Sequence, residues 1–305
     1  MIETTRSIDR AATIVLAIGI LFALGPFYLV VTTATSTFAT VVQGMPLRPG
    51  TALFANLHHV LFQTDIPQQV INSMIIAVLV TSGKAIVSVL SAFAIVYFDL
   101  KGKTVIFGMI LATMMMPIEV RIVSTYAVAS NVFTPFQDLI DITGVNDLIE
   151  MLTGMRLSLE VNLLNTYVGM ALPLIATATG TFLFRQFFQS IPRELSQAAR
   201  MDGAGPVRFL IDILLPLSKA PLGALTVIMF ESAWNQLIWP LMIATDPRME
   251  PAVVGLTEFQ TAFNSGQSPE YQYMMAAALL VIIPPLIVIA LLQRLIVRGL
   301  VIGEK

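Results

Sequence analysis

Four ionisable side chains interrupt stretches of sequence that are otherwise apolar, namely Lys84, Glu119, Arg121 and Glu231. Ionisable groups at such positions are costly in a membrane and usually face a cavity or a partner. Lys84 or Arg121 could offer positive charge to an anionic solute such as a phosphate ester. The alternatives are an interhelical pair of Lys84 with Glu231, or an Arg121 side chain that extends to the membrane interface. Glu119 and Arg121 are two residues apart, so they cannot pair side by side on a regular helix.

A second polar group follows Glu231 in the sequence. Asn235 and Gln236 lie between Trp234 and Trp239 and could hydrogen-bond the hydroxyl groups of a solute. A belt of aromatic side chains at the outer membrane interface would explain the two tryptophans equally well. Both interpretations stay open at the level of the sequence.

The loop 192–216 is the longest polar, arginine-bearing interruption in the apolar second half of the chain. Pro192 suits the first turn of a helix, where its missing N–H has no consequence. Ala198–Ala199 favours a helix and has no bulk, so that another surface can approach closely. Gly203 permits the positive φ that ends a helix, and Pro206 can open the next one. The loop is therefore predicted to form a helix–turn–helix that lies across one face of the membrane.

The composition excludes several classes of protein. Of the 305 residues, 56% are hydrophobic and 12% are charged, with a mean hydropathy of +0.81 and a net charge of −2. Soluble domains carry about 25% charged residues, so a helical membrane protein is expected, and no basic field exists to attract nucleic acid. Cysteine is absent, and the adjacent His58 and His59 are interpreted as loop residues rather than metal ligands. Lys101-Gly102-Lys103-Thr104 lacks the upstream glycine of a P-loop, because Tyr97 occupies that position. We expect no bound cofactor and no metal.

Six apolar segments are long enough to cross a bilayer as helices. They cover approximately residues 12–36, 70–97, 105–130, 163–187, 210–241 and 273–297. Twelve of the 17 lysines and arginines flank these segments on one face, which predicts that both termini are cytoplasmic. A cleaved signal peptide is the alternative for the first segment, although its apolar stretch is longer than a signal sequence requires.

The outer connections are too long for tight turns. Residues 136–152 alternate apolar and acidic side chains at helical spacing around Gly144. This pattern is typical of an amphipathic helix on the outer surface. The alternative is a docking surface for an extracytoplasmic partner.

Gln197-Ala198-Ala199, Gly203 and the run Ile213-Leu214-Leu215-Pro216 have the order and spacing of a known motif. They resemble the coupling loop of binding-protein-dependent ABC importer permeases, in the carbohydrate-importing branch. Leu90 to Ala94, Trp234 to Gln236 and Phe182 to Phe188 strengthen the resemblance from about residue 70 onward, especially to permeases for sn-glycerol-3-phosphate. Gln197 departs from the usual glutamate, so a charge-dependent contact is lost there. Glu194 is a partial substitute.

The resemblance implies an all-α polytopic membrane protein with six transmembrane helices, a type I ABC importer permease fold and a cytoplasmic coupling helix. It divides the chain into an N-terminal helix and outer loop (1–69), a permease domain (70–297) with coupling loop 192–216, and a cytoplasmic tail (298–305). The residues implied to couple to the ATPase are Glu194, Gln197, Ala198, Ala199, Asp202, Gly203, Ile213 and Pro216. Candidate residues of the solute path are Lys84, Arg121, Glu231, Trp234, Asn235 and Gln236.

The implied setting is the bacterial inner membrane, among membrane lipids. The implied partners are a second permease subunit, a homodimeric ABC ATPase that uses ATP and Mg, and an extracytoplasmic solute-binding protein. The chain itself would be non-catalytic. The expected solute is sn-glycerol-3-phosphate or a related glycerophosphodiester, and the alternative is a sugar or polyol. An ion-coupled secondary transporter is a competing hypothesis, but no internal repeat is found. A membrane enzyme would need a nucleophile or metal motif that the sequence lacks.

Overall fold

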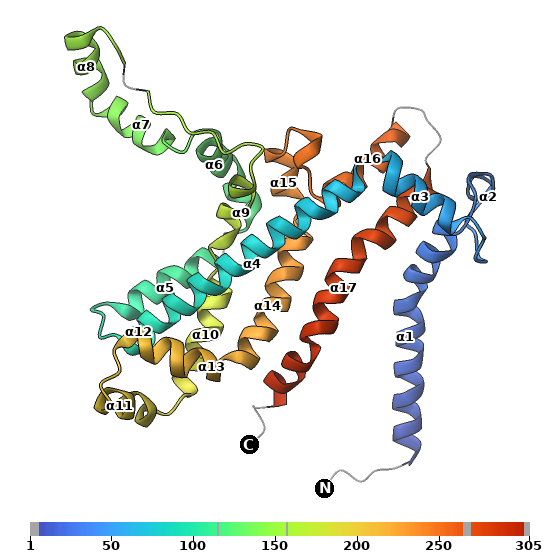
Figure 1. The fold of residues 1–305 in the computed structure, drawn as a ribbon, viewed down its shortest axis with the longest axis horizontal. Helices are drawn as coiled ribbons and strands as arrows, with labels where there is room; N and C mark the ends of the chain where they lie inside the picture. The colour runs from blue at the N-terminus through green and yellow to red at the C-terminus, as the bar shows by residue number, and fades with distance from the viewer. Residues whose placement is uncertain (1–5, 115, 157, 265–269, 302–305) are drawn as a thin grey trace. The chain divides into compact units, whose positions relative to one another are not determined.

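The computed structural model consists of helices joined by turns and loops (Figure 1), and it describes residues 6–114, 116–156, 158–264 and 270–301. No strand occurs within these ranges. The chain divides into two compact units. The N-terminal unit comprises Met1–Val70 and Val254–Ile283, and the central unit comprises Ile71–Val253 and Pro284–Lys305.

Three long helices and three short ones contribute to the N-terminal unit. They are α1 (Arg6–Ala34), α2 (Phe38–Gln43), α3 (Leu53–Gln63), the start of α4 (Ile66–Tyr97), most of α16 (Ala252–Asn264) and the first part of α17 (Tyr271–Val301). The central unit continues α4 and adds α5 (Lys103–Met114), α6 (Ile118–Ser130), α7 (Thr134–Ile142), α8 (Val145–Thr153), α9 (Tyr167–Ile175), α10 (Ala178–Ser190), α11 (Arg193–Met201), α12 (Pro206–Phe209), the π-helical turn η1 (Leu210–Leu214), α13 (Leu215–Leu217), α14 (Lys219–Trp234), α15 (Ile238–Ile243) and the 3-10 turn η2 (Pro247–Met249).

Three of the six predicted spans are present as single helices. Ile8–Ala34, Ile66–Tyr97 and Tyr271–Gln293 are long and apolar enough to cross a membrane. The fourth and fifth predicted spans are bent pairs of helices, with an angle of 49° between α9 and α10 and of 78° between Pro206–Leu217 and α14. The described residues thus contain three to five spans by length and composition. Taken together, the two helices of each bent pair meet the length and composition of a span at these two predicted positions.

The third predicted span is divided as well. Pro117 adopts φ −62° and ψ 151° at the N-cap of α6, so the helix that would have covered 105–130 is interrupted there. Proline has no N–H for the helical ladder and disfavours helical geometry in the residue before it. The result is two helices, α5 and α6, each shorter than a bilayer requires.

Pro216 explains the bend that precedes α14. A proline ring clashes with the carbonyl four residues earlier, here that of Asp212, and widens the helix locally. The chain responds with the π-helical turn η1, where the Leu215 N–H bonds to Leu210 O five residues back. Buried Ser218 then caps the freed turn, because its Oγ donates to Leu214 O at 2.6 Å. The Ile213-Leu214-Leu215-Pro216 run is therefore the local cause of the 78° change in direction.

A buried asparagine ends α1 within the N-terminal unit. Asn56 of α3 is 5% exposed, and its Nδ2 donates to Ala34 O at 2.8 Å and to Ser36 O at 2.9 Å. These bonds satisfy carbonyls that have no partner inside α1. The neighbouring His58 and His59 lie within α3, not in a loop as expected, and the His59 ring stacks on Tyr273 at 3.8 Å between centroids.

The predicted outer amphipathic segment forms two helices, α7 and α8, with the break at Gly144 as expected. Gly144 has φ +72°, a conformation that glycine adopts without strain. Within the central unit, α7 and α8 project away from the other helices (Figure 1). Arg156 bonds to Glu150 at 2.8 Å and to Asp147 at 3.0 Å, and these carboxylates raise the pKa of its guanidinium.

Candidate functional site

The short helix predicted in loop 192–216 is α11, and a Schellman motif ends it. Gly203 has φ +76°, its N–H bonds to Arg200 O at 3.0 Å, and the Ala204 N–H bonds back to Ala199 O at 2.8 Å. These two bonds satisfy the last carbonyls of the helix. Pro192 lies at the N-cap with ψ 135°, one residue earlier than the first-turn position that the sequence predicted. The turn is thus fixed by backbone bonds within the loop.

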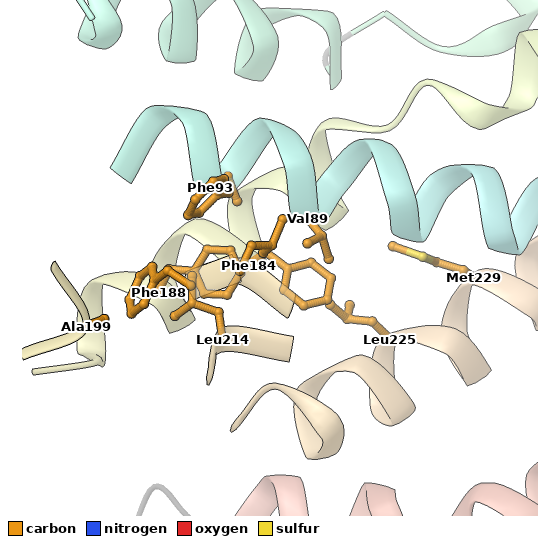
Figure 2. Packing of buried hydrophobic residues seen from close by; sticks show 11 residues of the cluster. Val89, Phe93, Phe184, Phe188, Ala199, Leu214, Leu225 and Met229 are labelled. Atoms are coloured by element: carbon orange, nitrogen blue, oxygen red, sulfur yellow. The ribbon is translucent and has the colours of Figure 1, made fainter. Parts of the chain in front are cut away.

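Ala199 packs α11 against the transmembrane helices. It is 5% exposed and packs in the apolar cluster formed by α4, α10, η1 and α14 (Figure 2). We define the aromatic seat as four residues of this region: Phe93, Tyr97, Phe188 and Phe209. The Tyr97 ring lies 5.2 Å from that of Phe209 and 6.1 Å from that of Phe188, both edge to face. A small side chain at position 199 lets the helix rest directly on these rings.

The opposite face of α11 is open to solvent. Glu194, Gln197 and Ala198 are exposed and share one face at helical spacing. Asp202, Gly203 and Pro216 are also exposed, whereas Ile213 is half-buried beside the apolar cluster. The residues implied to couple to an ATPase therefore divide into an outward set and two inward residues, Ala199 and Ile213.

Arg121 lines a cavity of about 570 Å³ in the central unit. Its walls come from α4, α5, α6 and the break between α9 and α10. Hydroxyl groups are frequent in them, from Ser91, Thr113, Thr177, Thr179 and Thr181. The Arg121 guanidinium can bind a phosphate or carboxylate through charge-assisted hydrogen bonds. Thr113 and Thr181 already donate their hydroxyl protons to the carbonyls of Ile110 and Thr177, so they can accept a hydrogen bond from a solute hydroxyl.

The other candidate solute-path residues do not join Arg121. Lys84 is half-buried on α4 and does not line this cavity. The alternative pair of Lys84 with Glu231 is also not formed: the described ion pairs involve only Arg156 and Arg208. Exposed Glu231 instead accepts a hydrogen bond from Asn235 Nδ2 at 2.6 Å. Gln236 is half-buried beside Asn235.

The two tryptophans are packing residues. Trp234 is 3% exposed and stacks on Phe230, with 5.7 Å between centroids. Trp239 is fully buried, and its Nε1 donates to the carbonyls of Gly169 and Met170 at 3.3 and 3.2 Å. An aromatic belt in contact with lipid headgroups does not account for side chains that are enclosed by protein, so that interpretation is wrong.

Comparison with known proteins decides the family. The model of the binding-protein-dependent transport system inner membrane component matches residues 84–302. The chain belongs to this family. The resemblance recognised in the coupling-loop motif is thereby confirmed, and this permease is a membrane component of an ABC importer.

Curated relatives extend the likeness to the whole permease. The chain is 41% identical over 312 positions to the sn-glycerol-3-phosphate transport system permease protein UgpE of Yersinia pestis, with 100% of both chains covered. It is 38% identical over 313 positions to the protein of the same name from Rhizobium meliloti, again with 100% of both covered. The likeness includes residues 1–69, which the motif-based resemblance did not reach.

Solved structures show the fold. A bacterial ABC transporter involved in the import of the acidic polysaccharide alginate matches with a TM-score of 0.71 and 22% identity, over 96% of this permease and 98% of that chain. A bacterial alginate ABC transporter in complex with a periplasmic protein bound to alginate pentasaccharide matches with a TM-score of 0.64 and 14% identity, over 95% and 94%. The ABC importer permease fold expected from the sequence is confirmed.

Sequence reasoning missed a polar network that joins Tyr167 and the segment 248–252 to α4. Asn72 Nδ2 donates to Arg248 O at 2.8 Å and to Glu250 O at 3.0 Å, and its Oδ1 accepts from the Tyr167 hydroxyl at 2.8 Å. The adjacent Ser73 Oγ accepts from the Ala252 N–H at 2.8 Å. The sequence signal was an Asn-Ser pair inside an apolar helix, because buried polar side chains must find partners.

Proposed function

We propose that this permease forms half of the translocation path of an ATP-driven importer for sn-glycerol-3-phosphate or related glycerophosphodiesters. The observation that carries the proposal is the two-sided construction of α11. Ala199 is buried on the aromatic seat, while Gln197 and Ala198 are exposed on the same rigid turn. A helix held from one side and open on the other is suited to receive a partner and to pass its movement to the spans.

The proposed topology has six spans with both termini in the cytoplasm. α1, α4, α9–α10, α12–α14 and α17 would provide five, and α5 with α6 would provide the third in chain order. The distribution of lysine and arginine supports this orientation, because cytoplasmic connections carry an excess of both. In this orientation α11 would lie on the cytoplasmic side.

The proposed partner at α11 is a homodimeric ABC ATPase, which would bind ATP and Mg itself. The outward face of α11 would enter a cleft in that ATPase. Gln197 could still donate and accept hydrogen bonds there, although it lacks the charge of a glutamate. Closure of the ATPases would push α11 against the aromatic seat and so move α4, α10 and α14.

The other proposed partners are a second permease subunit and an extracytoplasmic solute-binding protein. Binding-protein dependence is in the description of the family, and one structural relative is a transporter in complex with a periplasmic protein. The second permease would complete the path that this chain leaves open on one side.

The proposed solute follows from the named relatives and from the Arg121 cavity. A phosphate ester offers charged oxygens to the guanidinium and a glycerol moiety to the surrounding hydroxyls. A sugar or polyol remains the second candidate, since threonine hydroxyls also suit neutral solutes. A neutral solute would gain little binding free energy from Arg121, because it has no charge to pair with the guanidinium.

Uptake by the complete importer in proteoliposomes tests the solute. Arg121→Gln should lower uptake of sn-glycerol-3-phosphate by about tenfold or more, because one charge-assisted hydrogen bond contributes roughly 1.5–3 kcal/mol. Arg156→Gln is the matched control, since Arg156 is exposed and pairs with Glu150 and Asp147 outside the cavity. Equal uptake by both variants in normally assembled complexes would contradict the role of Arg121. Uptake of a sugar, but not of glycerol phosphates, by the wild type would favour the second candidate.

A further inference from the structure

A second cavity, of about 650 Å³, lies beside α11 and shares no lining residue with the Arg121 cavity. It is bounded by the ends of α4 and α10, the start of α5, and α11. Four basic residues and one carboxylate line it, namely Lys103, Arg185, Arg193, Arg200 and Asp99. This excess of positive charge is not needed for the solute path or for the contact proposed at the outward face of α11.

Arg185 is the least explained of these cations. Its guanidinium carbon stands 4.3 Å from the centre of the Phe107 ring, which holds the group in place by a cation–π contact. Its Nε is buried and has no hydrogen-bond partner within the described part of the chain. A buried donor without a partner is costly, so a ligand that supplies an acceptor would stabilise it.

The surface next to the cavity is apolar. Val105 of α5 follows the lining residue Thr104 and is 66% exposed, and Phe98, which lines the cavity, is 41% exposed. Val105 is on α5, which begins at Lys103, so a basic group and an exposed apolar side chain lie two residues apart on one helix. A ligand with an anionic head and apolar tails would match both surfaces.

We propose that this cavity binds the phosphodiester headgroup of an anionic phospholipid from the cytoplasmic leaflet. The proposal uses the orientation argued above, which places the cavity at the cytoplasmic interface. Basic pockets between helices at that level attract anionic headgroups. The acyl chains would lie along the exposed side of α5.

The position of the cavity gives such a lipid a role in coupling. Ser196, Gln197 and Arg200 of α11 line it together with Tyr97 of the aromatic seat. A bound headgroup would therefore join α11 to the ends of α4 and α10 by charge as well as by packing. The importer should then depend on anionic lipid for efficient use of ATP.

The test uses the complete importer in detergent, titrated with phosphatidylglycerol or with phosphatidylcholine and examined by native mass spectrometry. The wild type should retain phosphatidylglycerol in preference to phosphatidylcholine. Lys103→Gln and Arg185→Gln should each weaken retention of phosphatidylglycerol about fivefold, because a basic group near anionic headgroups contributes a factor of that order. Arg208→Gln, which removes a paired cation outside the cavity, should have no effect. Lys103 is exposed, so its variant is informative even if Arg185→Gln fails to assemble.

Three results would overturn the proposal. The first is equal retention of phosphatidylglycerol by the wild type and both cavity variants. The second is binding of inorganic phosphate to lipid-free importer that depends on Arg185 and is not displaced by phosphatidylglycerol, which would make the cavity a site for free phosphate. The third is loss of the ATPase from both variants with lipid retention unchanged, which would assign the cavity to the ATPase interface.

Discussion

The loop at α11–α12 and the pair α7–α8 share one local backbone feature and differ in how they pack against the rest of the central unit. Each has two short helices around a glycine with positive φ, +76° at Gly203 and +72° at Gly144. Ala199 of α11 is buried on the aromatic seat. In α7 and α8 only Asn146 is buried, and it donates to Asp141 at 2.5 Å instead of packing on apolar side chains.

We infer from this difference that packing, rather than the turn, would allow a helix pair to transmit movement. Burial of apolar area and close contact resist displacement from every direction. Exposed ion pairs such as those of Arg156 give little resistance, because water and salt compete with them. We therefore expect changes at the aromatic seat to affect both stability and transport, and equivalent changes in α7–α8 to affect neither strongly.

Removal of a seat residue should have the largest effect. Phe188 is 1% exposed, so Phe188→Ala should lower the free energy of unfolding by about 3 kcal/mol, as large-to-small core substitutions do. Thermal unfolding of the detergent-solubilised protein and ATP-driven uptake would both report it. Phe136→Ala on α7, where the ring is 61% exposed, is the control and should leave both unchanged. Similar losses in the two variants would remove the distinction between the regions.

The two adjacent alanines of α11 should separate stability from coupling. Ala199→Leu overpacks the seat and should lower the free energy of unfolding by about 1–3 kcal/mol. Ala198→Leu places the same side chain on the exposed face, so stability should be kept while ATPase co-purification and uptake fall. Thermal unfolding with affinity co-purification checks both variants. Loss of stability from Ala198→Leu alone would mean that the inward and outward faces are assigned the wrong way round.

The glycines permit a matched comparison of smaller effect. Gly203→Ala and Gly144→Ala both impose left-handed backbone on an alanine, and each should reduce stability by about 1 kcal/mol. No atom would obstruct the new Cβ at either position, so the loss of stability would come from the left-handed backbone conformation alone. Only Gly203→Ala should lower uptake relative to ATP hydrolysis. Uncoupling by Gly144→Ala would show that the outer pair also transmits movement.

The smallest effect is expected at Arg156. Its side chain is 60% exposed, so Arg156→Gln should leave the melting temperature unchanged within error, at low and at high salt. Differential scanning fluorimetry at two salt concentrations measures this. A salt-dependent loss of stability would mean that α7–α8 relies on its surface ion pairs more than their exposure suggests.

The parts of this permease that sequence could predict are those set by local chemistry. Gly203 and Pro206 marked the turn and the second helix start, and Gly144 marked the break in the outer segment. Apolar length was enough to find α1, α4 and α17. These features depend on neighbours in the chain, which a reader of the sequence can see.

What could not be predicted depends on partners distant in sequence. Pro117 and Pro216 were noticed, but whether a proline bends or divides a helix depends on how its freed carbonyls are satisfied. Ala199 is buried in a cluster with Phe93, about a hundred residues earlier in the chain. The buried Trp239 bonds to the carbonyls of Gly169 and Met170, 70 and 69 residues earlier. A pair of Glu231 with Lys84 was one alternative, and Glu231 instead bonds to Asn235 one turn away. Glu119 stays a prediction, since its side chain is outside the described residues.

Site-directed cross-linking tests the central claim most directly, namely that α11 receives the ATPase on one face and rests on the spans with the other. The chain has no cysteine, so Ala198→Cys and Ala199→Cys can be compared in the intact importer without removing native thiols. Ala198→Cys should cross-link to the ATPase, and Ala199→Cys should not. The account is contradicted if position 198 fails to reach the ATPase, or if position 199 reaches it equally well.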